Sequence, residues 1–218
     1  MDAFMQVFQR PDFMKNFIVH VELSVAAILI AVAISVPVAI AVNRSDLAST
    51  VAINTGNIGR AVPSLAILVL VLPLFGLSFT TALVALTVLA IPPILINAVV
   101  GLRQVSRPLL DAARGMGLSG RQILTGIQLP IAAPIMFAGA RTSAVQVVAS
   151  ATLATFIGAG GLGDYIVEGY QRNSTAIALA GALSVAVLAI ITEVLFGRLE
   201  KGFTPKGLRI AQQRRKTK

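Results

Sequence analysis

Long apolar runs are the feature that most constrains the fold of this 218-residue chain. A transmembrane helix needs about 20 mostly apolar residues, and five stretches of the chain meet this requirement. Their expected bounds are 18–42, 47–75, 79–102, 131–157 and 174–197. Only 12% of the residues are charged, whereas a soluble domain usually carries about 25%. We therefore predict an all-α polytopic membrane protein with about five transmembrane helices, organised as a single membrane domain over residues 1–218.

The distribution of lysine and arginine predicts how the chain is oriented in the membrane, because cytoplasmic segments carry an excess of both. The segments after the first, third and fifth runs hold most of them: Arg44, Arg103, Arg107, Arg114, Arg121 and the eight basic residues of the tail 198–218. The opposite side holds only Arg10, Lys15 and Arg172. We expect the N-terminus outside and the C-terminus in the cytoplasm. The basic tail is interpreted as an anchor to anionic membrane lipid and not as a nucleic-acid site.

One polar, glycine-punctuated stretch, "LLDAARGMGLSGRQILTGIQLP" (109–130), separates the third run from the fourth. Pro108 is suited to the first turn of a helix over 109–116, and Gly117 is suited to the positive φ that ends one. Ser119 is expected to cap a second helix over 120–127, which Pro130 stops before the fourth span begins. A helical pair with small and apolar side chains on a cytoplasmic surface is typical of a docking element.

The spacing within this stretch resembles the EAA loop of the permease subunits of binding-protein-dependent ABC importers. From Asp111 the chain reads D-A-A, three residues, Gly117, nine residues, Ile127, one residue, Leu129 and Pro130. The one departure is Asp111, where the family pattern has glutamate. Two further stretches, "AVPSLAILVLVLP" (61–73) and "TLATFIGAGGLGDYIVEGY" (152–170), are similar to the osmoprotectant branch, which imports glycine betaine, carnitine and choline.

The resemblance implies the type I ABC importer permease fold and a set of partners. These are a second permease subunit (identical or different), two cytoplasmic ATPase subunits that hold ATP and Mg²⁺, and an extracytoplasmic solute-binding protein. Transport would proceed by alternating access in the bacterial cytoplasmic membrane, with the segment 103–130 as the ATPase-docking loop. The docking residues would be Asp111, Ala112, Ala113, Gly115, Met116, Gly117, Leu118, Ser119, Ile127, Leu129 and Pro130. The alternatives are a permease for methionine or another amino acid, a secondary transporter and a membrane scaffold.

The chain lacks the residues for chemistry of its own. A P-loop ends in Gly-Lys-Ser/Thr, and no lysine here follows a glycine. The sequence has no cysteine and one histidine, so we expect no metal site and no cofactor within this chain. The protein is predicted to be a transport subunit and not an enzyme.

Polar residues inside the apolar runs are candidates for a translocation path, because such groups are costly in lipid unless they face water or a partner. They are Asn54, Asn57 and Ser64 with Arg60 in the second run, Asn97 in the third, and Ser143, Gln146 and Ser150 in the fourth. Hydrogen bonding between helices is an equally good account of each. For Arg141 we expect a structural ion pair and not a contact to the transported solute.

A glycine-rich stretch, "GAGGLGD" (158–164), follows the fourth run. It lacks the strand and helix of a dinucleotide site, so we interpret Gly158, Gly160, Gly161 and Gly163 as a flexible or closely packed turn at an outer gate. Asp164 and Glu168 are expected to face the outside, towards the binding protein, and His20 to pair with Glu22 near the outer interface. Aromatic cages hold quaternary ammonium groups, and the chain has two tyrosines and no tryptophan, so selection is expected to lie in the binding protein.

Overall fold

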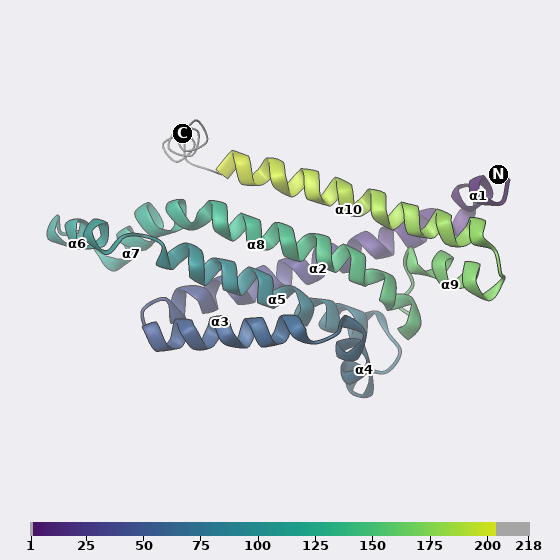
Figure 1. Cartoon of the computed structure of the whole chain (residues 1–218), viewed down its shortest axis with the longest axis horizontal. Coiled ribbons are helices and arrows are strands. Elements are labelled where there is room, and N and C mark those ends of the chain that lie inside the picture. Colours follow the sequence, from purple (N-terminus) through teal and green to yellow (C-terminus); the bar gives the residue numbers. More distant parts are fainter. Residues whose placement is uncertain (1, 204–218) are drawn as a thin grey trace.

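The structure, a computed structural model, describes residues 2–203 and is an elongated bundle of helices (Figure 1). Four helical stretches in it are long and apolar enough to cross a membrane. They are α2 (Pro11–Val42), α5 (Phe79–Arg103), the continuous stretch Gly120–Ile157 and α10 (Thr175–Phe203). A bent pair of helices described below brings the number to five when the pair is counted as one span. The expected all-α polytopic fold is therefore confirmed for the described residues.

Helix α5 forms the centre of the bundle and packs against α2 and against α8 (Leu129–Ser150), while α10 packs against α8. The residues at these contacts are apolar and fully buried, with Leu86 and Ile94 on α5, Leu23 on α2 and Val147 on α8. The outward faces are apolar as well, and on α10 the side chains of Leu183, Val187 and Ile190 are 50%, 54% and 63% exposed. This arrangement is that of a bundle whose outer surface meets lipid.

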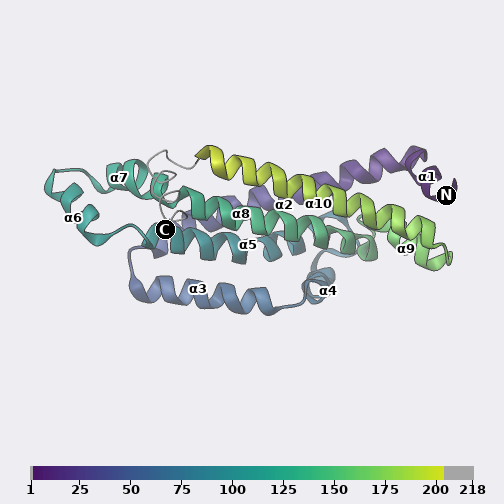
Figure 2. The same cartoon turned by 45° about the horizontal axis from the view of Figure 1, so that its top comes forward.

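The second run is a broken span and not the continuous helix expected from the sequence. It forms α3 (Asp46–Ala61) and α4 (Ser64–Phe75), and the two axes differ by 94°. The break falls at Val62, which adopts an extended conformation with ψ 126°, because the ring of Pro63 disfavours a helical conformation in the residue before it. Helix α3 lies along α5 and α4 turns away at its end (Figure 2).

The two ends of the bundle carry different short helices (Figure 1). At one end, here called the α6 end, lie α6 (Arg107–Gly115) and α7 (Gly120–Ile123). At the other, the α9 end, lie α1 (Asp2–Phe8), which packs on α10, and α9 (Gly163–Gln171). The sequence patterns did not predict α1 or α9.

Helix α7 continues into α8 through a π-helical turn, η1 (Leu124–Gln128), and α8 continues into a 3₁₀ stretch, η2 (Ala151–Ile157). The expectation that Pro130 stops the second docking helix is therefore wrong. The N–H of Leu129 bonds to the carbonyl of Leu124, five residues back. Pro130 is the second residue of α8 and directly follows the π-helical turn, so the helical stretch runs through it.

Candidate functional site

The candidate docking element projects from the α6 end and begins with α6. Pro108 lies in the first turn of this helix, as predicted. Ala113 is buried, while Asp111 and Arg114 form an exposed ion pair of 3.0 Å along one face. The carboxylate of Asp111, which stands where the family pattern has glutamate, is therefore paired with Arg114 of the same helix.

A reverse turn joins α6 to α7, and its geometry confirms two predictions made from the sequence. Gly117 has φ +82° and donates its N–H to the carbonyl of Arg114 at 2.9 Å. Ser119 caps α7: its hydroxyl accepts from the N–H of Gln122, whose side chain accepts from the N–H of Ser119 at 2.8 Å. Only glycine adopts this positive φ without strain, and the reciprocal cap satisfies two free N–H groups. The turn is thus a defined structure and not a loose loop.

The turn presents an open surface. A Cβ atom added at Gly115, Gly117 or Gly120 would meet nothing within 4 Å, and the side chain of Met116 is 73% exposed. Of the remaining predicted docking residues, Asp111, Ala112, Ser119 and Pro130 are exposed and Leu118, Ile127 and Leu129 are half-buried. The structure therefore gathers 111–119 into one protrusion, whereas Ile127, Leu129 and Pro130 belong to the helical stretch that leads into the bundle.

The polar residues proposed for a translocation path fall into two groups. Asn54, Asn57 and Arg60 are exposed on α3, and Ser64 is half-buried at the start of α4. The others lie inside the bundle. Ser143 donates a hydrogen bond of 3.0 Å to the carbonyl of Ala90 on α5, and Asn97 donates one of 2.8 Å to Pro93 on its own helix. Gln146 and Ser150 are half-buried on α8. The structure brings these two groups to different faces of α5.

The glycines proposed for an outer gate form a tight turn at the α9 end. Gly158, Gly160 and Gly161 all have positive φ, between +70° and +110°. A Cβ on Gly163 would lie 2.2 Å from the carbonyl oxygen of Thr152, so no larger residue fits there. Close packing is one of the two alternatives that the sequence left open for this turn, and the positive φ values were not predicted.

His20 holds this turn against the bundle, and its expected pairing with Glu22 is wrong. The His20 side chain is fully buried. Its Nε2 lies 2.9 Å from the carbonyl of Val148, and its Nδ1 accepts from the N–H of Leu162 at 3.3 Å. Nδ1 therefore carries no proton and Nε2 donates. The sequence could not predict this contact, because the partners of His20 are backbone groups more than 120 residues away.

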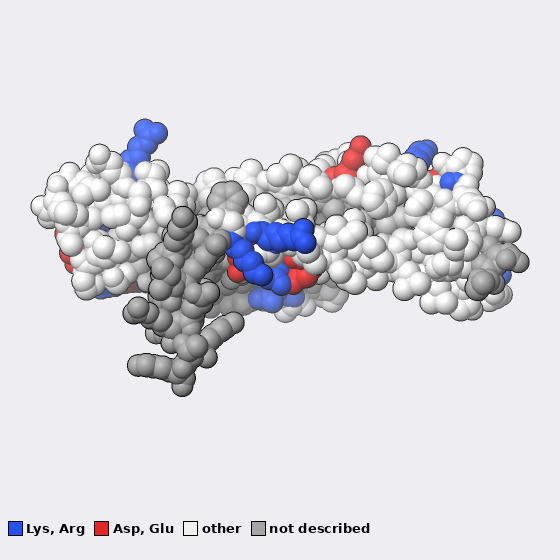
Figure 3. Space-filling view, turned by 90° about the horizontal axis from the view of Figure 1, so that it is seen from above, with Lys and Arg blue, Asp and Glu red and all other residues white. Residues whose placement is uncertain are grey.

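Two ion-pair clusters tie helices together. On α8, Arg141 pairs with Glu193 and, at 3.3 Å, with Glu200 of α10, which confirms the expected structural role. Figure 3 shows charged side chains gathered over α10 on a face that is otherwise largely uncharged.

At the α9 end, Glu168 pairs with Arg10 at 2.7 Å and with Arg172 at 3.1 Å, and its hydrogen bond raises the pKa of Arg10. Asp164 accepts a hydrogen bond from Thr155. Both carboxylates expected to face outwards are thus engaged within the chain.

An apolar bundle that crosses the membrane several times, with a glycine-hinged pair of short helices exposed at one end, is the architecture of a transporter permease subunit. The chain belongs to the family described as binding-protein-dependent transport system inner membrane component, whose model matches residues 31–205. This confirms the family suggested by the loop spacing.

Named relatives and solved structures agree with this membership. The chain is 37% identical to the carnitine transport permease protein OpuCB of Listeria monocytogenes over 98% of this chain and 99% of that one. It is 38% identical to the glycine betaine/carnitine/choline transport system permease protein OpuCB of Bacillus subtilis over 87% of each chain. Its fold matches an inward-facing structure of the MetNI methionine ABC transporter with a TM-score of 0.76 at 22% identity, over 90% of this chain and 100% of that chain. The type I ABC importer permease fold is confirmed.

Proposed function

We propose that this chain is the permease subunit of an ATP-driven importer of osmoprotectants such as glycine betaine, carnitine or choline. The observation that carries the proposal is the exposed turn at Gly117, which combines the family's loop spacing with a surface that no described residue covers. Relatives named for these solutes match along nearly the whole chain, which favours osmoprotectants over methionine. The methionine transporter shares the fold at a much lower identity.

The α6 end is proposed to be cytoplasmic and to dock an ATPase subunit that supplies ATP and Mg²⁺. Two features support this orientation. Arginines cluster at the α6 end, as the positive-inside rule requires of cytoplasmic segments. Coupling between the ATPase and the spans needs an element that moves as one body. The reciprocal cap between Ser119 and Gln122 gives the turn a defined structure, which suits it to this role.

A second permease subunit is proposed to cover the polar face of α3. Asn54, Asn57 and Arg60 are exposed on a helix that lies at the depth of the membrane spans. Exposing such groups to lipid is costly, whereas an aqueous path between two subunits satisfies them. The glycine turn at 158–163 is proposed as the outer gate, where the solute-binding protein delivers its cargo. Gln146 and Ser150 on α8 lie at a different face of α5, and their part in the path stays a prediction.

Crosslinking tests the docking proposal directly, because the chain has no native cysteine. A Ser119→Cys variant, reconstituted with the ATPase and binding protein encoded alongside it, should crosslink to a cysteine placed in the ATPase cleft. Thr125→Cys is the matched control: it is equally exposed, but it lies in η1 beyond the turn. Failure of every position from 115 to 120 to crosslink would refute docking at this element.

Uptake by the same reconstituted complex tests the transport proposal. Radiolabelled glycine betaine, carnitine or choline should accumulate in proteoliposomes only with ATP, and vanadate should block it. Methionine uptake alone would refute the osmoprotectant assignment and leave the permease assignment intact. ATP-independent uptake would refute the importer itself.

A further inference from the structure

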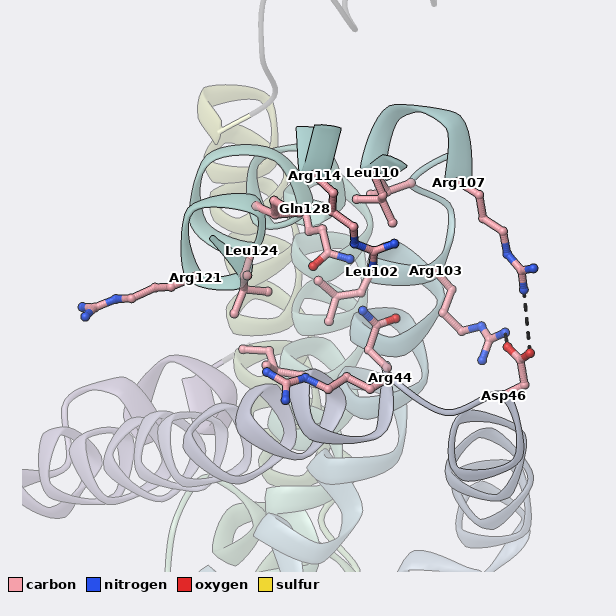
Figure 4. A pocket seen from close by; sticks show the side chains of 15 residues that line it. Arg44, Asp46, Leu102, Arg103, Arg107, Leu110, Arg114, Arg121, Leu124 and Gln128 are labelled. Atoms are coloured by element: carbon pink, nitrogen blue, oxygen red, sulfur yellow. Dashed lines mark hydrogen bonds and ion pairs between the residues drawn. The ribbon is translucent and has the colours of Figure 1, made fainter. Parts of the chain in front are cut away.

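A cavity of about 590 Å³ lies at the α6 end, between the spans and the candidate docking element. Its walls come from the C-terminal ends of α2 and α5 and the first turn of α3 on one side, and from α6, α7 and η1 on the other. Figure 4 shows the side chains that line it. Helix α6 packs chiefly against α7, so this space separates α6 from the ends of the spans.

The cavity carries a large excess of positive charge. Its lining includes one carboxylate, Asp46, and five arginines: Arg44, Arg103, Arg107, Arg114 and Arg121. Asp46 pairs with Arg103 and, at 3.7 Å, with Arg107. Within the part of the chain that the structure describes, Arg44 forms no ion pair, and the partner of Arg114, Asp111, is not part of this lining. The described residues thus leave positive charge that an anion would neutralise.

The arginines are not equivalent in their direction. Arg114 and Gln128 point towards one another across the cavity, Arg44 lies below them, and Arg121 points away (Figure 4). Apolar side chains line the cavity between these polar groups, and three of them, Ile40, Leu110 and Leu124, are half-buried and so keep accessible surface. The cavity therefore combines positive charge with apolar surface.

We propose that this cavity binds the phosphate of an anionic phospholipid headgroup. It lies where the apolar helices α2 and α5 end, which is the depth of lipid headgroups, and basic pockets between helices on the cytoplasmic side bind such headgroups. A free phosphate would gain nothing from the apolar side chains of the lining, which suit the glycerol and upper acyl carbons of a lipid. An acidic segment of a partner would meet the exposed turn at 115–119 before this cavity.

The bound lipid would connect α6 to the spans. Arg114 belongs to α6 and Arg44 follows α2, so one phosphate between them would hold the docking element at a fixed height above the membrane. Lipid binding by the permease alone does not depend on the transported solute or on the ATPase. An absence of lipid binding can therefore be distinguished from a failure of the proposed transport function.

The test measures how much phosphatidylglycerol the purified full-length permease retains, by native mass spectrometry after extraction from mixed phosphatidylglycerol and phosphatidylcholine bilayers. Arg44→Gln should weaken retention about fivefold, and the double variant Arg44→Gln/Arg114→Gln about 25-fold, since each basic group near an anionic surface contributes roughly equally. Arg44 forms no ion pair with a carboxylate among the described residues, so the Arg44→Gln variant should fold. If the double variant fails to fold, the single variant still tests the proposal.

Two matched controls remove the same charge elsewhere. Arg198→Gln does so at the C-terminal end of α10, where the side chain is exposed and lies outside the cavity lining, and Lys15→Gln/Arg172→Gln does so at or near the α9 end. Both should retain phosphatidylglycerol like the wild type. Equal losses in all variants would mean diffuse surface attraction and would overturn the proposal.

Two further arms separate other occupants. Retention of added inorganic phosphate without preference for phosphatidylglycerol would make this a free-anion site. Wild-type lipid retention in the double variant, together with loss of ATPase association, would assign the arginines to carboxylates of the partner. Either result would overturn the proposal.

Discussion

Substitutions at Gly117 test whether the docking turn requires a residue that adopts positive φ and carries no side chain. Its φ of +82° costs an ordinary L-residue about 1–2 kcal/mol, while a Cβ there meets no atom of the described residues within 4 Å. Gly117→Ala therefore adds strain without a clash. If all of that strain falls on the docked state, the affinity for the ATPase drops about 5- to 30-fold.

Two isosteric replacements separate bulk from charge at the same position. Asparagine and aspartate both tolerate positive φ better than alanine does, so Gly117→Asn tests whether a side chain fits the ATPase cleft. Gly117→Asp adds a charge to the same shape. We expect Gly117→Asp to abolish transport, Gly117→Ala to reduce it within the range above, and Gly117→Asn to fall between them.

The assay is ATP-dependent uptake in proteoliposomes, with ATPase co-purification measured on the same preparations and correct insertion checked by protease accessibility. Gly126→Asp is the control, because this residue is equally open but lies in the π-helical turn away from the hinge. Uptake at the wild-type rate by a correctly inserted Gly117→Asp variant would refute the docking argument. Loss of insertion would show that the turn serves folding instead.

Three further perturbations test other parts of the chain. Truncation after residue 207 should leave transport measurable and change only its response to salt or lipid, because the deleted residues are polar and distal to the last span; loss of complex assembly on a native gel would contradict this. His20→Leu should lower the melting temperature by several degrees, because the Leu162 N–H and the Val148 carbonyl lose their side-chain partner at about 1–3 kcal/mol for each buried group, while His20→Gln, which keeps a donor and an acceptor, should lose less. Asn57→Ala or Gln146→Ala should slow uptake of glycine betaine, carnitine and choline by a similar factor in a competition assay, and selective loss of one solute would place a binding site in this chain.

Local signals explain most of what the sequence predicted correctly. Pro108, Gly117 and Ser119 act through their own backbone or a neighbour's, so each could be assigned from residue type and spacing. The apolar runs likewise predicted the spans, because length and hydropathy decide membrane crossing. The tail at 204–218 lies outside the described residues, and its role as a lipid anchor stays a prediction.

Long-range contacts explain what was missed. Periodicity could not show that His20 bonds to backbone groups of two distant segments, or that five arginines from α5, α6, α7 and the loop between α2 and α3 line one cavity. The break at Val62 was visible as an X-Pro step within a long apolar run. Hydropathy does not report a change in helix direction, however, so α3 and α4 were predicted as one helix.

The packing of α3 on α5 determines which way the polar face points, and this strengthens the case for a second subunit. A Cβ on Gly56 would lie 2.8 Å from Ile96, and one on Gly59 would lie 3.2 Å from Pro92. These two glycines therefore allow α3 to approach α5 closely. Rotating the helix to hide Asn54 or Arg60 would place a larger side chain into that contact, and overpacking is itself destabilising. The polar face is consequently fixed away from the bundle, and because lipid is a poor solvent for it, water or another protein chain must cover it.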